Sequence, residues 1–195
     1  MTKDDLKTLL AQQPDREFVD RQLLEQRPWI FPTDQAYDAW RVAVTSSINL
    51  SRDSIRIVGS AALGFSLSPL KPGRPFRTSV SASALASDVD IAFVDWKLFG
   101  DAWDAIVDAD RGQSLRVDNS EKHKLRLDVY WGVVADFSVP ANTNPSRLLR
   151  TALSEAGRTA PIRGHPVHCR IYRRIDDLRA YHISSLRNLR KSLSA

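Results

Sequence analysis

The stretch Ser87-Asp-Val-Asp-Ile-Ala-Phe-Val94, in which acidic and apolar residues alternate, constrains the fold most strongly. In a β-strand, successive side chains point to opposite faces, so Asp88 and Asp90 share one face and the apolar residues share the other. Two neighbouring carboxylates repel each other and resist ionising together unless a cation lies between them. Oxygen ligands of this kind suit Mg²⁺ or Mn²⁺. The sequence therefore predicts a strand that carries a divalent-metal site formed by Asp88 and Asp90.

A glycine-serine turn precedes this strand. Ser54-Ile-Arg-Ile-Val58 is rich in β-branched residues and bounded by polar ones, which predicts a short buried strand. Gly59 and Ser60 follow it, and Ala61-Ala-Leu63 predicts the first turn of a helix. Glycine lets the backbone approach a ligand closely, the amides at a helix start attract phosphate, and Ser60 adds a hydroxyl donor. The two motifs together indicate a nucleoside triphosphate held between a phosphate-binding turn and a metal-binding strand.

This combination resembles the nucleotidyltransferase superfamily, in which a hydrophobic-Gly-Ser turn precedes a strand with the pattern Asp-hydrophobic-Asp-hydrophobic. Gly59, Ser60, Asp88 and Asp90 match that motif residue by residue, and the resemblance covers about Ser54 to Val94. It implies a small stand-alone bacterial enzyme that transfers a nucleoside monophosphate from a triphosphate such as ATP to a hydroxyl of a protein, RNA or nucleotide. It also implies Mg²⁺ or Mn²⁺ as cofactor, pyrophosphate as product, and a toxin–antitoxin or phage-defence setting.

The spacing of the two motifs departs from the family pattern. The family separates them by about a dozen residues, whereas 27 residues lie between Ser60 and Asp88 here. We interpret the excess as a flexible loop over the site whose Lys71, Arg74 and Arg77 bind the nucleotide. The alternative is a solvated basic surface loop without a ligand.

Members of the superfamily normally add a third carboxylate from a neighbouring strand. Lys124-Leu-Arg-Leu-Asp-Val-Tyr130 alternates, which predicts a strand with Asp128 on its polar face. There Asp128 would complete the metal site or act as general base for the attacking hydroxyl. Asp136 is the rival candidate, and the alternative for both is an ion pair with an arginine at a sheet edge.

The fold class predicted is α+β, a nucleotidyltransferase-like mixed sheet flanked by helices, with helical extensions at both ends. We expect a single domain made of a helical N-terminal extension (1–52), a core (53–140) and a basic C-terminal helical region (141–195). From Asn144 onward there are 11 Lys and Arg against 3 Asp and Glu. Such a region would attract a triphosphate or RNA, and the alternative is a solubilising face without a ligand.

Periodicity and capping residues predict the other elements. Asp95 is expected to cap a helix to about Asp110 whose buried face includes Trp96, and Ser146 to cap a helix to about Glu155. His182 falls on the apolar stripe of the last helix, where a packing role is expected. The remaining expectations are helices over Asp4–Ala11, Arg16–Gln26, 34–50 with Thr33 as cap, and Ile175–Leu193, and a strand around Val167–Ile171.

The lone Cys169, the absence of a membrane-length apolar run and an N-terminus without a signal-peptide core predict a cytoplasmic protein with no membrane partner. Three hypotheses about function remain open at this point. In the first, the chain is an active nucleotidyltransferase. In the second, it is a catalytically silent module of that fold that binds nucleotide or RNA. In the third, it is an interaction protein in which the two acids are merely structural.

Overall fold

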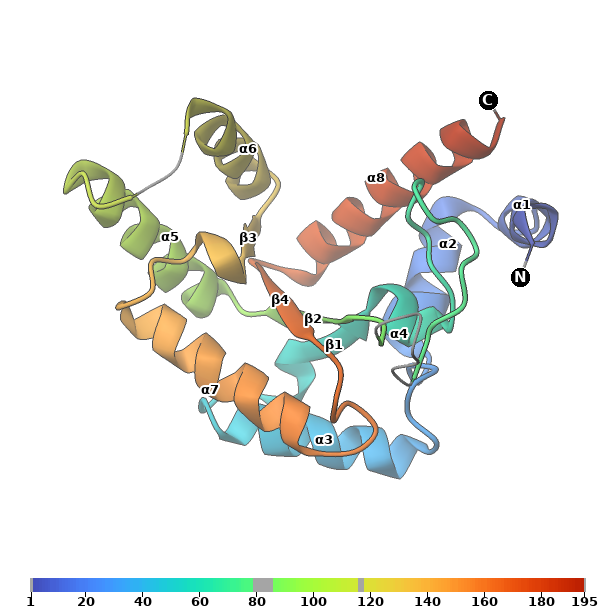
Figure 1. Ribbon diagram of the computed structural model, residues 1–195, viewed down its shortest axis with the longest axis horizontal. Helices are drawn as coiled ribbons and strands as arrows, with labels where there is room; N and C mark the ends of the chain where they lie inside the picture. The colour runs from blue at the N-terminus through green and yellow to red at the C-terminus, as the bar shows by residue number, and fades with distance from the viewer. Residues whose placement is uncertain (1, 79–85, 116–117, 195) are drawn as a thin grey trace.

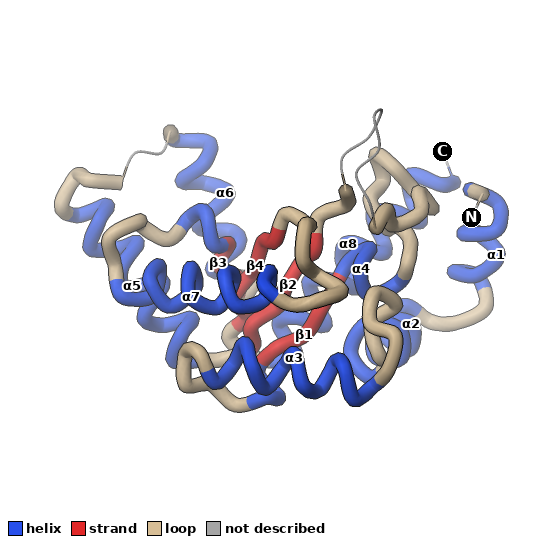
Figure 2. Tube along the Cα trace, turned by 60° about the horizontal axis from the view of Figure 1, so that its bottom comes forward, coloured by secondary structure: helices blue, strands red, loops and turns tan. Residues whose placement is uncertain are grey.

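A four-stranded mixed sheet forms the centre of the protein (Figures 1 and 2). The computed structural model describes residues 2–78, 86–115 and 118–194. The strand order is β1-β2-β4-β3, in which β2 runs antiparallel to β1 and parallel to β4, and β3 runs antiparallel to β4. The predicted α+β class with a mixed sheet is therefore confirmed. The strands are β1 (Ile55–Val58), β2 (Val89–Val94), β3 (Val133–Ala135) and β4 (Val167–Tyr172).

Helices cover both faces of the sheet (Figure 1). One face packs against α3, α5 and α7, and the other packs against α8, which in turn contacts α1 and α2. The helices are α1 (Lys3–Ala11), α2 (Asp15–Val19), the π-helical η1 (Asp20–Glu25), α3 (Asp34–Ser46), α4 (Gly59–Leu63), α5 (Trp96–Arg111), α6 (Asn119–Tyr130), α7 (Asn144–Arg158) and α8 (Ile175–Ser194), with 3₁₀ turns η2 (Arg52–Ser54) and η3 (Asp136–Ser138).

Apolar side chains on both sides of the strands anchor these layers. Ile57, Ile91 and Ile171 are almost completely buried under the α3, α5 and α7 layer. Each such side chain contributes on the order of 1.5–3 kcal/mol by leaving water. On the α8 face, Ala92 and Tyr172 belong to a second, smaller buried cluster. That smaller cluster does not cover the whole face, and the polar residues of β2 and β4 lie where it stops.

The predicted N-caps of α3 and α5 are confirmed. The Thr33 hydroxyl accepts a hydrogen bond from the Ala36 amide at 3.1 Å, and the Asp95 carboxylate accepts one from the Leu98 amide at 2.7 Å. The helix expected to reach residue 50 ends at Ser46, and Asn49 follows with a positive φ of 57°. Trp96 is 74% exposed, so its expected place on the buried face is wrong.

The predicted start of α7 is wrong by about one turn. Thr143, not Ser146, is the N-cap, and its hydroxyl accepts a hydrogen bond from the Ser146 amide at 3.4 Å. Pro145 lies in the first turn, where its missing N–H would have had no helical partner, so the proline does not delay the helix.

The strand predicted over residues 124–130 is also wrong, because this segment is the second half of α6. Asp118 and Glu121 form a reciprocal capping box, with amide-to-carboxylate distances of 2.9 and 2.8 Å, which starts a helix at Asn119. Leu125 and Val129, four residues apart, pack against the core, while Leu127 is 48% exposed. The helical period therefore sets the burial, and the apparent alternation of apolar residues does not.

Arginines of the basic C-terminal region pair with acids of the N-terminal helices. Arg190 and Arg187 lie 2.7 and 3.3 Å from the carboxylate of Asp15, and Arg179 lies 2.6 Å from that of Asp20. These ion pairs hold α8 against α2 and η1, so much of the predicted anion-attracting charge has an intramolecular partner. The same C-terminal region also supplies β4, an inner strand of the sheet. No described helix combines the length and apolar character needed to cross a membrane.

Candidate functional site

The glycine-serine turn lies directly against the second aspartate of β2. Val58, the last residue of β1, pairs with Asp90 across the sheet, so the chain passes Asp90 as it turns into α4. Gly59 has a φ of +67°, and a Cβ at this position would lie 3.0 Å from Oδ2 of Asp90. Both the left-handed backbone and this close approach require glycine here. The turn and the acid predicted to share a ligand are therefore neighbours in space.

A cavity of about 550 Å³ opens beside this turn, on the α8 face of the sheet. Cavities of this size hold ligands as large as nucleotides. The helix α8 contributes Tyr181, His182 and Ser185 to its wall, and η1 contributes Leu23. The wall also includes seven of the residues predicted from the sequence, namely Gly59, Ser60, Lys71, Arg74, Arg77, Asp88 and Asp90.

The segment that carries the three predicted basic residues is more regular than expected. Ser66 and Arg74 are joined by an amide-to-carbonyl hydrogen bond of 2.9 Å, and the Gly73 amide bonds the Ser66 carbonyl at 2.9 Å. Arg77 and Ser87 then exchange two hydrogen bonds, of 3.0 and 3.1 Å, which tie the end of this segment to the start of β2. Residues 66–77 thus form a hydrogen-bonded lobe, while the rest of the predicted flexible loop, 79–85, lies outside the described residues.

The two aspartates differ in their surroundings. Asp88 precedes β2 and is exposed, whereas Asp90 is half-buried in the cavity wall. Burial raises the pKa of the Asp90 carboxyl above its ordinary value, and the nearby Arg170 guanidinium offsets part of that rise. The Asp90 carboxylate therefore lies in an environment that favours binding a cation or a proton.

Neither candidate for a third carboxylate lines the cavity. Asp128 lies on α6, where burial raises the pKa of its carboxyl although Lys124 and Arg170 are near enough to lower it in part. Asp136 follows β3, and its carboxylate accepts hydrogen bonds from the backbone amides of Cys169 and Phe137 at 3.2 and 2.8 Å. The expectation that Asp128 stands beside Asp88 and Asp90 on a neighbouring strand is therefore wrong, because the segment is helical.

The strand that does lie beside β2 is β4, whose Arg170 was expected only as one of many arginines in the phosphate-attracting C-terminal region. His168 pairs with Asp90 in register, and Arg170 follows on the same face. Arg170 lines the cavity, and its Nη1 lies 3.9 Å from Oδ1 of Asp90. The alternation of Val167, Cys169 and Ile171 already placed Arg170 on the polar face of a strand, but nothing in the sequence placed that strand next to β2.

Two histidines lie next to the site, one beside the backbone before Asp88 and the other in the cavity wall. Nδ1 of His165 lies 2.7 Å from the carbonyl oxygen of Ser87, and its ring stacks on Phe76 with ring centres 5.2 Å apart. This contact fixes the backbone immediately before Asp88. His182 packs beside Tyr172 and Tyr181, and burial lowers the pKa of its imidazole to about 4, so the ring is neutral at pH 7.

The charged residues of the cavity wall suit a metal-bound polyphosphate. Among the described residues of the wall, four are basic (Lys71, Arg74, Arg77 and Arg170) and two are acidic, which leaves a net charge of +2. No three His, Cys, Asp or Glu side chains of the described ranges come together as a self-sufficient metal site. Mg²⁺, however, is held in many nucleotide sites by one or two carboxylates, with phosphate and water oxygens in the other positions. Asp88 and Asp90 fit that requirement.

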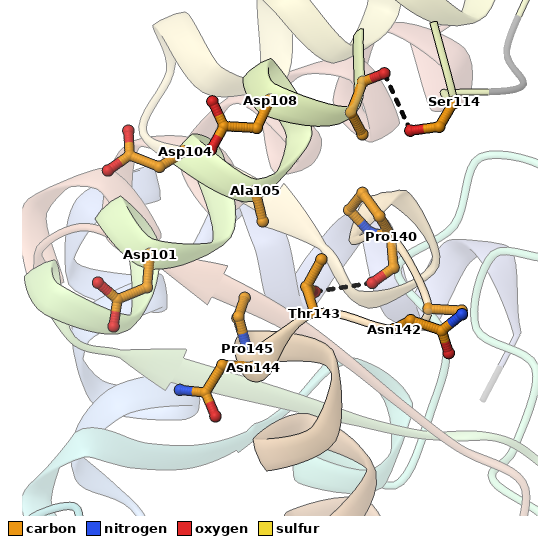
Figure 3. Close-up of a pocket in the computed structure, with 12 residues that line it drawn as sticks. Asp101, Asp104, Ala105, Asp108, Ser114, Pro140, Asn142, Thr143, Asn144 and Pro145 are labelled. Atoms are coloured by element: carbon orange, nitrogen blue, oxygen red, sulfur yellow. Dashed lines mark hydrogen bonds between the residues drawn. The ribbon is translucent and has the colours of Figure 1, made fainter. Parts of the chain in front are cut away.

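A larger cavity, of about 790 Å³, lies between α5 and the turn before α7 (Figure 3). Asp101, Asp104 and Asp108 follow one another along α5 at its edge, and the turn is closed by a 2.7 Å hydrogen bond from the Thr143 hydroxyl to the Pro140 carbonyl. No lysine or arginine lines this cavity in the described part of the chain. An acidic wall without basic residues repels phosphates, so the cavity beside Gly59 is the better candidate site.

Comparison of the chain with models of protein families, with curated proteins and with solved structures finds no match. The chemistry of the cavity is therefore inferred from its own residues. These residues form a wall with a glycine-serine turn, a carboxylate pair and four basic side chains, all within one cavity on one face of the sheet.

Proposed function

We propose that this protein is a metal-dependent nucleotidyltransferase, which transfers a nucleoside monophosphate from a nucleoside triphosphate to a hydroxyl acceptor and releases pyrophosphate. The observation that carries the proposal is the close approach of the glycine-serine turn to Asp90, in a cavity that Asp88 also lines. Gly59 lies so close to Asp90 that a Cβ would reach 3.0 Å from its carboxylate. A ligand in the cavity therefore touches a phosphate-binding turn and a cation-binding pair at the same time.

The carboxylate pair, the basic residues of the lobe and Ser60 each have a role in this reaction. Asp88 and Asp90 would hold Mg²⁺ or Mn²⁺, which when bound neutralises phosphate charge and activates the acceptor hydroxyl. Lys71, Arg74 and Arg77 bind the phosphates that leave as pyrophosphate, and the Ser60 hydroxyl donates to one of their oxygens. The acceptor oxygen attacks the α-phosphorus in line and forms a new P–O bond, while the hydroxyl proton passes to solvent water. The bond to the pyrophosphate oxygen breaks as that group takes the electron pair.

Charge supports a triphosphate over smaller anions. A nucleoside triphosphate carries a charge of about −4 at neutral pH and about −2 with one Mg²⁺ bound, which the +2 wall complements. A monophosphate also carries about −2, but it brings no metal ion and so leaves the two carboxylates of the wall without a cation. The metal–triphosphate complex is thus the ligand that matches both the net charge and the carboxylate pair.

A second candidate is a catalytically silent module that binds the nucleotide without transferring it. The observation that favours it is the neighbourhood of Asp90. The adjacent strand β4 offers His168 and Arg170 on the same face, and no third carboxylate of the described residues lines the cavity. Without a carboxylate to act as general base, the acceptor hydroxyl would have to lose its proton to water, helped only by the metal ion.

Incubation with each α-labelled triphosphate tests these candidates. The protein is supplied with Mg²⁺ or Mn²⁺, alone and together with cellular RNA and protein, and the fate of the label is followed. Transfer by the wild-type protein that disappears in Asp88→Asn supports the enzyme. Binding of nucleotide without transfer to any acceptor supports the silent module, and no binding of any triphosphate rejects both.

A further inference from the structure

Among the described residues of the cavity wall, Arg170 is the one basic residue that comes from the sheet itself. It lies on β4, on the same face as Asp90 of the neighbouring strand β2. Its Nη1 is 3.9 Å from Oδ1 of Asp90, and its Cζ is 5.6 Å from the centre of the Tyr181 ring on α8. The guanidinium therefore lies inside the cavity, between a carboxylate and an aromatic ring.

The contact with Asp90 is a loose one. A separation of 3.9 Å is an ion pair without a hydrogen bond, so the guanidinium is not locked to this carboxylate. Arginine stays charged, stacks on aromatic rings and binds phosphate through two parallel N–H groups. The Tyr181 ring can therefore support Arg170 whichever anion the guanidinium faces.

A metal ion and Arg170 compete for the same carboxylate. Oxygen atoms of Asp90 are needed by a cation held between Asp88 and Asp90, and a guanidinium beside them repels that cation. A triphosphate in the cavity offers Arg170 an alternative anion with more charge. Moving the guanidinium from Asp90 to a phosphate oxygen would remove the repulsion and leave the carboxylate to the ion.

We propose that Arg170 couples metal binding to nucleotide binding. Before the nucleotide binds, Arg170 pairs with Asp90 and weakens binding of the metal, and a bound triphosphate attracts the guanidinium and frees Asp90. The site would then take the metal–triphosphate complex in preference to either component. This inference rests on the proposed function, because it takes a nucleoside triphosphate as the ligand. By thermodynamic linkage, the metal must raise the affinity for triphosphate by the same factor.

The coupling can be measured without any turnover. Binding of Mn²⁺ to the full-length protein is followed by electron paramagnetic resonance, with and without a non-hydrolysable triphosphate analogue. In the wild-type protein the analogue raises the Mn²⁺ affinity. In Arg170→Gln, Mn²⁺ alone binds about tenfold more tightly, and the increase caused by the analogue is about tenfold smaller, within the usual range for coupled sites.

Three further variants separate this role from a general loss of charge or of structure. Arg174→Gln removes an exposed arginine just beyond the same strand and outside the cavity, so it binds Mn²⁺ and the analogue like the wild-type protein. Tyr181→Phe keeps the aromatic ring and the coupling. Tyr181→Leu removes the ring and weakens the coupling, and thermal denaturation confirms that each variant is folded.

Two results would overturn the inference in different ways. If Arg170→Gln binds the analogue but shows the wild-type Mn²⁺ affinities, Arg170 has no coupling role, although the proposed function stands. If the wild-type protein binds Mn²⁺ but no triphosphate analogue, the proposed function fails and the coupling fails with it.

Discussion

Substitution of Gly59 by alanine tests the geometry of the candidate site most simply. The φ of +67° costs an L-residue about 1–2 kcal/mol, while the loss of glycine flexibility in the unfolded chain returns about 0.4–1 kcal/mol. We therefore expect Gly59→Ala to lower the free energy of unfolding by about 1 kcal/mol. In a domain of this size, that change corresponds to a decrease in Tm of about 2–4 °C.

The same substitution has a larger effect on ligand binding than on stability. The new Cβ would lie 3.0 Å from Oδ2 of Asp90, closer than such contacts normally are, so the carboxylate must move away from the turn. Because the turn and the carboxylate are proposed to bind one metal–triphosphate complex, we expect affinity for that complex to fall by at least tenfold. Calorimetric titration with a non-hydrolysable triphosphate and Mg²⁺ measures this loss.

Gly100→Ala is the matched control. Gly100 lies within α5, and a Cβ there would meet no atom within 4 Å. Alanine should therefore raise the stability by about 0.5–1 kcal/mol and leave binding unchanged. Wild-type Tm and wild-type triphosphate affinity in Gly59→Ala would refute both the strained turn and its place in the binding site.

Three other predictions follow from the same contacts. Asp90→Asn should abolish Mg²⁺-dependent nucleotide binding yet raise Tm at pH 7. The pKa of Asp90 is raised in the folded protein, so its stabilising contribution is present below the unfolded pKa and is lost as the pH rises through the folded pKa. The difference in Tm between the variant and the wild type should therefore shrink towards pH 3. A lower Tm of the variant at pH 7 would contradict this. Asp128→Asn should leave the Mn²⁺ affinity in the presence of nucleotide within about twofold of wild type, because Asp128 does not line the cavity. Loss of a metal ligand or of a hydrogen bond to the ligand would have a larger effect than that. A tenfold loss would return Asp128 to the metal site. His165→Ala should lower the free energy of unfolding by about 1–3 kcal/mol, because the Ser87 carbonyl loses its hydrogen-bond partner. Denaturant titration measures this loss, with His123→Ala at an exposed site as the control. An unchanged free energy of unfolding in His165→Ala would contradict the prediction.

The parts of the site that could be predicted from sequence are those fixed by local patterns. Alternation placed Asp90 on the polar face of a buried strand, and the glycine-serine pair after the preceding strand marked the turn. These two segments are joined by an antiparallel pairing, so their closeness follows from neighbouring strands in the sheet. Seven of the eight residues assigned to the metal and the phosphates line one cavity, and Asp128 is the exception.

The third carboxylate could not be predicted in the same way, because the alternation of apolar residues around Asp128 is compatible with either a strand or a helix. Residues 124–130 read as a strand by alternation, but the Asp118 to Glu121 capping box a few residues earlier determines a helix. Burial of Leu125 and Val129 against the core follows the helical period. The capping box was visible in the sequence and would have corrected the assignment.

Arg170 shows a different limit. Its strand was predicted, and so was its polar face, yet the order β1-β2-β4-β3 inserts a late strand beside β2. A parallel neighbour that arrives almost eighty residues later cannot be inferred from local spacing. The basic residue that pairs with Asp90 therefore becomes evident only from the topology of the sheet.

The most direct test of the central claim is the structure of the protein with Mg²⁺ and a non-hydrolysable nucleoside triphosphate. We predict one ion about 2.1 Å from carboxylate oxygens of both Asp88 and Asp90, sharing phosphate oxygens with a nucleotide that touches Ser60. A triphosphate bound elsewhere on the protein, or bound in this cavity with its metal away from both aspartates, would contradict the claim.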